Sequence, residues 1–261
     1  MSELTQRFDA VWARIADAVA ASARSGRPAG TVRLVAVSKG HGAEAVADLA
    51  RHWDGRAGRP LFGESYMQEA RGKMSLAREL LDAASARELI TIAPEWHFIG
   101  HVQSKKAKDI VGRYSLIHSV DSLKLAQALG KAWRDRAAGA PMGLDEAAPD
   151  PQPVLIQVNV GREAQKSGVD PDGLEALALS IAAMPELNLQ GLMCIPPLAD
   201  IGKDSRPYFV LLRELRDKME SVCGLRLPEL SMGMSDDFAA AIEEGATLVR
   251  IGTDIFGQRS A

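Results

Sequence analysis

The sequence is poor in cysteine and has no long apolar run. Its two cysteines, Cys194 and Cys223, lie far apart. That spacing excludes a disulfide framework or a C-x-x-C zinc site and is typical of a reducing compartment. No apolar stretch approaches the length of a membrane span. Residues 1–27 carry charges throughout their apolar pattern, so they predict an amphipathic helix and not a signal peptide. We therefore expect a soluble, cytoplasmic protein.

The sequence also has no excess of positive charge and few aromatic residues. The formal net charge is −3, there is no basic block, and only 5% of the residues are aromatic. A protein that binds duplex nucleic acid normally shows a basic stripe, so nucleic acid is not an expected partner. The 261 residues suffice for one large domain or two small ones, and length alone does not decide. With 46% apolar and 25% charged residues, the composition is ordinary for a soluble globular protein.

Short apolar runs alternate with stretches of helical period along almost the whole chain. The expected strands are residues 32–38, 61–64, 96–100, 116–120, 154–160, 189–194, 229–232 and 248–252. The expected helices between them include residues 42–52, 65–83, 122–138, 171–184, 207–222 and 236–244. Regular alternation of this kind predicts a parallel sheet. Eight strands favour a single (β/α)₈ TIM barrel over residues 1–261, whereas an open doubly wound sheet would usually have fewer.

Two segments depart from the alternation. Residues 137–153 are rich in Pro, Ala, Gly and acidic residues, and they predict a flexible loop at about 139–152 that does not divide the chain into domains. Only residues 253–261 follow the last expected strand. The extra N-terminal helix is therefore expected to cover the gap in the outer ring.

Candidate phosphate-binding groups follow the seventh and eighth strands, where such barrels often hold phosphate. The segment SMGMSDD supplies the Ser231 and Ser235 hydroxyls, a close backbone approach at Gly233 and the start of a helix. The segment RIGT adds Gly252 and Thr253. The alternative is a plain helix cap and a plain turn. The presence of both loops at these two positions favours an anion site.

Two basic residues complete the candidate site. Lys39 ends an apolar strand, where burial would favour the neutral amine that attacks an aldehyde. The alternative is a lysine whose amine reaches solvent. Arg250 lies on the eighth strand. Its side chain points either into the barrel or outward, where it would form an ion pair with a helix, and its position alone does not decide between these alternatives. If the ligand of this site carries a pyridine ring, a guanidinium against the ring nitrogen would disfavour protonation of that nitrogen.

At these residues the sequence resembles the YggS/PROSC family of pyridoxal 5'-phosphate (PLP) homeostasis proteins, which share the barrel of alanine racemase (PLP fold type III). The similar segments are LVAVSK (34–39), FGESYMQEA (62–70), WHFIGHVQSKKAK (96–108), IHSVDS (117–122), VLIQVNVGREAQKSGV (154–169), GLMCIP (191–196) and residues 230–259. The resemblance covers nearly the whole chain. Ser65 stands where the family usually has asparagine, so an amide hydrogen bond from that position is not expected.

The resemblance implies a PLP site and the residues that form it. Lys39 would form the Schiff base, SMGMS (231–235, including Met234) and RIGT would bind the phosphate, and Arg250 would face the pyridine nitrogen. Asn159 and Met193 would line the ring pocket. His97 and His118 lie inside expected strands and are interpreted as hydrogen-bonded core residues rather than catalytic bases. Neither the histidines nor the cysteines show metal-ligand spacing.

Two functions remain open at this point, a PLP carrier and a PLP-dependent amino-acid racemase. Two-base racemisation needs an acid/base group opposite the lysine, which alanine racemase supplies as a tyrosine from a C-terminal β-domain. No such domain is expected here, and Tyr66, Tyr114 and Tyr208 fall in expected helices or connections. The carrier is favoured, with PLP and PLP-dependent apo-enzymes as partners and a monomer or weak homodimer as the assembly. A barrel aldolase is weaker, because its Schiff-base lysine usually comes from a later strand.

Overall fold

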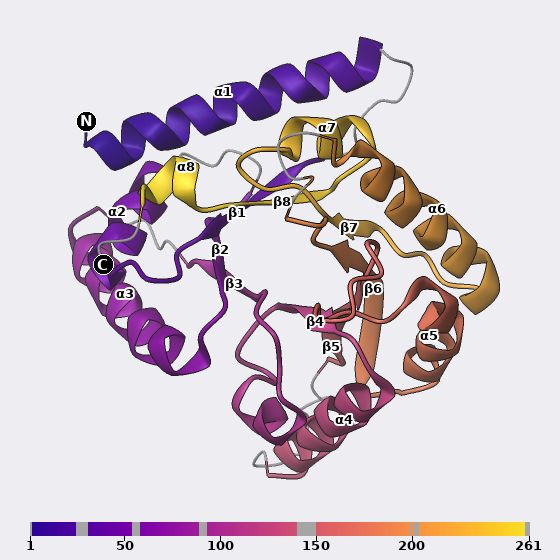
Figure 1. Ribbon diagram of the computed structural model, residues 1–261. Coiled ribbons are helices and arrows are strands. Elements are labelled where there is room, and N and C mark those ends of the chain that lie inside the picture. Colours follow the sequence, from indigo (N-terminus) through magenta and orange to yellow (C-terminus); the bar gives the residue numbers. More distant parts are fainter. Residues whose placement is uncertain are drawn as a thin grey trace.

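The computed structural model describes residues 2–24, 31–53, 58–88, 93–139, 150–198, 200 and 204–258. Its eight strands are β1 (Arg33–Val37), β2 (Leu61–Glu64), β3 (Glu95–Phe98), β4 (Leu116–Val120), β5 (Gln152–Val158), β6 (Leu187–Cys194), β7 (Glu229–Ser231) and β8 (Leu248–Ile251). Each strand pairs in parallel with the next, and β8 pairs with β1, so the sheet closes into a barrel (Figure 1). The predicted TIM barrel is confirmed.

Helices surround the barrel in chain order (Figure 1). They are α1 (Glu3–Arg24), α2 (Ala43–His52), α3 (Met67–Glu88), α4 (Leu123–Ala138), α5 (Leu174–Ala182), α6 (Arg206–Cys223), α7 (Phe238–Glu243) and α8 (Thr253–Phe256). Since helices cover the outer face and side chains fill the interior, most strand residues are buried on whichever face they point to. None of the helices in the described ranges is long and apolar enough to cross a membrane.

Helix α1 completes the outer ring, as expected. Its buried residues Phe8, Val11, Ile15 and Ala18 recur every three or four positions, which places them on one face. This face packs against α7 and α8, and Figure 1 shows α1 lying along the outer side of both. The short α8 could not cover β8 and β1 by itself.

Three connections differ in detail from the sequence-based expectation. The β3–β4 connection, for which the sequence gives no helix range, contains the 3₁₀-helix η1 (Ser104–Asp109). The helix expected at 171–184 begins as the 3₁₀-helix η2 (Pro171–Gly173) and continues as α5. The lysine-rich η1 segment lacks the apolar period of an amphipathic helix. Strand β5 begins at Gln152, whose N–H donates to the Glu186 carbonyl at 2.9 Å. This bond extends the strand into the expected loop, and residues 140–149 of that loop lie outside the described residues.

Candidate functional site

The residues on either side of Lys39 are held by hydrogen bonds. Lys39 lies two residues after Val37, the last residue of β1, and is half-buried. The Ser38 Oγ donates to Glu64 Oε1 at 2.6 Å, and the Ser38 carbonyl accepts from Lys73 Nζ at 2.7 Å. On the other side, the Gly40 N–H donates to Glu69 Oε1 at 2.7 Å. The position from which the Lys39 side chain departs is therefore fixed.

A buried ion pair joins these contacts. Lys73 Nζ lies 2.8 Å from Glu64 Oε1 and 2.7 Å from Glu69 Oε1. Burial raises the pKa of Glu64, although Lys73 and Ser38 act in the opposite direction. The other Glu64 oxygen is buried with no hydrogen-bond partner in the described structure. Lys73 was not among the residues expected from the sequence. Its i,i+4 spacing from Glu69 was the available signal, but it also fits an ordinary surface pair.

Arg250 points into the barrel, which decides the alternative that sequence left open. Its side chain donates to Ser231 Oγ at 2.7 Å and to the Cys194 carbonyl at 2.8 Å. Burial lowers its pKa, yet a guanidinium keeps its proton at any ordinary pH. Within the described ranges Arg250 forms no salt bridge to a carboxylate. A buried cation with only neutral acceptors is costly, so an electron-rich ligand atom beside it would be favourable.

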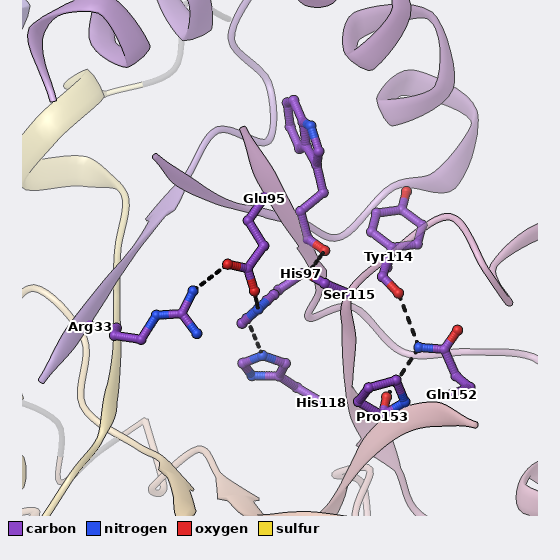
Figure 2. Close-up of polar contacts among 9 residues, drawn as sticks. Arg33, Glu95, His97, Tyr114, Ser115, His118, Gln152 and Pro153 are labelled. Carbon is purple, nitrogen blue, oxygen red and sulfur yellow. Dashed lines mark hydrogen bonds and ion pairs between the residues drawn. The ribbon is translucent and has the colours of Figure 1, made fainter. Parts of the chain in front are cut away.

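A chain of buried polar side chains continues from Ser231 across the barrel. Ser231 Oγ lies 2.8 Å from His118 Nδ1, and His118 Nε2 lies 2.9 Å from His97 Nδ1. His97 Nε2 reaches Glu95 Oε1 at 3.1 Å, and Glu95 pairs with Arg33 at 2.5 Å (Figure 2). Both histidines are hydrogen-bonded core residues, as predicted.

Burial sets the charge of these histidines. It lowers the pKa of His97, although the Glu95 carboxylate opposes that effect. It lowers the pKa of His118 well below the usual value, with further contributions from His97, Arg250 and Arg33. Both imidazoles are therefore neutral at pH 7.

The two predicted phosphate loops lie against different elements, the loop after β7 against α7 and the residue after β8 against the end of β1. Gly233 has φ +90°, and a Cβ there would lie 2.6 Å from the Ala241 Cβ, so only glycine fits between the loop and α7. A Cβ on Gly252 would lie 3.2 Å from the Val37 carbonyl, two residues before Lys39. Ser235 is half-buried, and Thr253 is exposed at the start of α8.

Arg14 on α1 ties the same two loops together. Its guanidinium donates to the Ser235 carbonyl at 3.1 Å and pairs with Asp254 at 2.5 Å. It also lies 4.6 Å from the centre of the Phe238 ring. The N-terminal helix therefore holds the loop after β7 and the helix after β8 in a fixed relation. Arg14 was not among the residues expected from the sequence, because nothing local marks a contact 240 positions away.

The remaining predicted site residues have structural partners. The Asn159 amide donates to the Glu163 carbonyl at 2.9 Å and accepts from the Glu163 N–H at 3.2 Å, so it shapes the loop after β5. Met193 is buried on β6, opposite Ser231 in the strand register. The Ser231 hydroxyl is engaged by Arg250 and His118. Contacts from these three residues to a cofactor stay predictions.

A separate groove of about 710 Å³ lies outside the barrel, between α3 and the η1 region. Its lining includes Arg71, Arg78, Lys106, Arg113 and Arg136. None of the predicted site residues lines it, so the site is identified by its chemistry and not by cavity size.

A closed parallel barrel with a lysine after β1 and a buried arginine on β8 defines the class of alanine racemase-like barrels. Residues 14–260 match the family model for the alanine racemase N-terminal domain. A solved alanine racemase of Corynebacterium glutamicum has the same fold, with a TM-score of 0.60 at 20% identity over 94% of this chain and 62% of that one.

More similar proteins refine this class. The "Pyridoxal phosphate homeostasis protein" of Pseudomonas aeruginosa is 42% identical over 99% of this chain and 97% of its own length. The human protein of the same name is 37% identical over 96% and 84%, respectively. PipY of Synechococcus elongatus, solved with PLP bound, superposes with a TM-score of 0.69 at 31% identity over 98% of this chain and all of that one. The chain belongs to the family of pyridoxal phosphate homeostasis proteins.

Proposed function

We propose that this protein binds PLP as a Schiff base on Lys39 and serves intracellular PLP homeostasis as a carrier rather than an efficient enzyme. The observation that carries the proposal is the buried Arg250 guanidinium, whose acceptors among the described residues are neutral. It lies on β8, the strand that pairs with β1, and Lys39 follows β1 by two residues. A pyridine nitrogen is an electron-rich atom that would suit its remaining N–H groups.

The residues at the barrel mouth fit the other parts of PLP. Strands β1 and β8 pair through Val35 with Arg250 and Ala36 with Ile251, so the two strand ends are adjacent. The Gly252 approach to Val37 brings the loop after β8 beside the base of Lys39. Gly233 lets the loop after β7 pack closely on α7. We propose that Gly233, Met234, Ser235, Gly252 and Thr253 hold the phosphate. Ser231 was expected with them, but its hydroxyl is engaged by His118 and Arg250, so we place it with Asn159 and Met193 around the ring.

The protein's own groups explain why holding is favoured over turnover. When bound, PLP supplies an aldehyde carbon and a pyridine ring that can accept electrons. Arg250 stays charged, so it keeps a proton off the ring nitrogen and weakens the ring as an electron sink. No tyrosine in the described ranges is an evident second acid/base. Tyr66 is exposed, Tyr114 is buried in the core, and the Tyr208 hydroxyl donates to Asp200 at 2.7 Å.

The comparisons support the carrier and not the racemase. The curated relatives at 36–42% identity carry the name of a homeostasis protein, whereas the alanine racemase of C. glutamicum is 20% identical. A cytoplasmic location and delivery of PLP to apo-enzymes form part of the proposal.

Absorbance spectroscopy tests the lysine assignment. The protein loaded with PLP should show a visible imine band that borohydride reduces, and mass spectrometry should place the reduced adduct on Lys39. Lys39→Ala should lack the band. Lys131→Ala, which removes an exposed lysine paired with Asp135, should keep it. A reducible band in Lys39→Ala would refute the assignment.

Two activity measurements separate carrier from racemase. Chiral chromatography after incubation with a panel of amino acids should show little conversion, and turnover comparable with a dedicated racemase would refute the carrier. Transfer of PLP to an apo-enzyme in the presence of an aldehyde trap should exceed transfer from free PLP.

A further inference from the structure

Arg250 and the side chains that link it to the opposite end of the barrel come from five strands. Arg33 and Glu95 are the first residues of β1 and β3. His97 and His118 lie on β3 and β4, Ser231 ends β7, and Arg250 lies on β8. His118 and Ser231 are hydrogen-bonded although their strands lie three positions apart in the sheet. This chain of hydrogen bonds therefore crosses the barrel interior. Figure 2 shows the half from Arg33 to His118.

The chemistry of its two ends fixes the direction of every hydrogen bond. The hydrogen bond from His97, with help from Arg33, lowers the pKa of Glu95 to about 2, so Glu95 is a carboxylate that can only accept. Arg250 can only donate. A neutral imidazole has one N–H and one lone pair, so each histidine that donates on one side must accept on the other.

Starting from Glu95, only one arrangement satisfies all four contacts with both imidazoles neutral. His97 donates from Nε2 to Glu95, which leaves its Nδ1 to accept from His118 Nε2. His118 Nδ1 is then an acceptor, and the Ser231 hydroxyl must donate to it. The Ser231 oxygen is left with lone pairs for Arg250 Nη1.

We propose that Glu95 is a positioning residue for the guanidinium that faces the PLP ring, because its carboxylate orients His97, His118 and Ser231 so that Ser231 presents a pure acceptor to Arg250. This inference rests on the proposed function for the identity of the ligand. It assigns a role to residues at the barrel end opposite the proposed PLP site.

Two fixed acceptors hold Arg250 in place. The Ser231 oxygen and the Cys194 carbonyl each accept one N–H of the guanidinium, and among the described residues the other N–H groups have no acceptor and can bind a ligand. If Glu95 became neutral, the chain could also run in reverse, with His118 Nδ1–H donating to Ser231. The Ser231 hydroxyl proton would then have no acceptor among these side chains. It would compete with the Arg250 N–H for the space beside the Ser231 oxygen.

Charged groups from several strands face the two histidines. They are Arg33 on β1, Glu95 on β3, Glu229 on β7 and Arg250 on β8. Glu229 offers a matched control because it also begins its strand, is half-buried and acts on His97 by charge alone. Its carboxylate accepts from Thr247 Oγ1 at 2.5 Å instead of joining the chain.

Nuclear magnetic resonance of the full-length protein, without any cofactor, tests the direction of the hydrogen bonds through His97 and His118. In protein labelled with ¹⁵N-histidine, His97 and His118 should both show a protonated Nε2 and an unprotonated Nδ1 at pH 7. Single Gln substitutions of His41, His52 and His101 identify the other three signals. An Nδ1–H tautomer or an imidazolium at His118 overturns the proposal, and this result does not depend on whether any variant folds.

Release of PLP tests the positioning role. Glu95→Gln should release PLP about fivefold faster than the wild type, equivalent to the loss of one hydrogen bond of about 1 kcal/mol. It should also shift the pH midpoint of the imine absorbance. Glu229→Gln should release PLP within about twofold of the wild-type rate and keep the wild-type midpoint, and melting curves should report similar stability for both variants.

The outcomes distinguish this inference from the proposed function. A wild-type protein without an imine band refutes the proposed function and the inference with it. A normal band in the wild type together with equal release from Glu95→Gln and Glu229→Gln refutes the positioning role alone.

Discussion

Replacing Lys73 with methionine should strongly destabilise the protein, because it leaves the Glu64 carboxylate buried without its cation. The side chains of Lys73 and Glu64 are 4% and 0% exposed, so solvent cannot replace the lost partner. Removing one member of a buried pair typically costs about 3–5 kcal/mol. In a domain of this size each kcal/mol lowers Tm by about 2–4 °C, so the lower figure predicts a fall of about 6–12 °C.

The deficit should grow with pH. Burial already raises the pKa of Glu64 above its unfolded value, and removing Lys73 raises it further. A carboxyl group with a raised pKa binds its proton more tightly when folded. Its contribution to stability is therefore complete below the unfolded value of 4.5 and is lost as pH rises through the folded pKa. Urea unfolding of Lys73→Met should show a larger loss at pH 8 than at pH 5.

Two further variants make this reasoning refutable. Adding Glu64→Gln to Lys73→Met removes the buried charge, so the double variant should recover much of the stability and lose the pH dependence. Lys131→Met breaks a pair whose side chains are 70% and 63% exposed, and it should cost less than about 1 kcal/mol. A cost for Lys73→Met that matches Lys131→Met, or a deficit independent of pH, would contradict the account of this cluster.

Three other substitutions test the support around the site. Arg14→Ala should speed PLP release about two- to fivefold, because it removes the contacts that join the loop after β7 to α8. Arg7→Ala, which breaks an exposed pair with Glu3, should leave the release rate unchanged. Gly233→Ala should abolish stable PLP retention in a gel-filtration assay, while Gly58→Ala, equally strained in φ but with open space around its Cβ, should retain it. Phe8→Ala should lower the free energy of unfolding in urea by about 3–5 kcal/mol, because Phe8 is fully buried among Trp12, His52 and Trp53. A loss below about 1 kcal/mol would mean that α1 is not needed to cover the barrel.

Strand number and order were predictable because each strand is a local apolar run. The segments at 61–64 and 116–120 match β2 and β4 as the structure has them. Differences occur at ends where a distant carbonyl accepts one more hydrogen bond, as Glu186 does for Gln152. The helix after β3 was not predictable in this way, because η1 has no apolar period to mark it.

The candidate site was predictable wherever fold position alone implies a role. Lys39 follows a strand, and the segments after β7 and β8 lie where such barrels bind phosphate. Lys73 and Arg14 were missed, because each acts through a partner on another element and carries no local mark of that contact.

The sequence by itself determined the barrel, the family and the order in which its candidate site residues follow the strands. Only the tertiary structure decided that Arg250 points inward and that a chain of hydrogen bonds leads from it to Glu95. Strands buried on both faces do not alternate between apolar and polar residues, so the sequence does not say which side chains face the interior. His118 and Ser231 are 113 residues apart, and only closure of the barrel brings their side chains together.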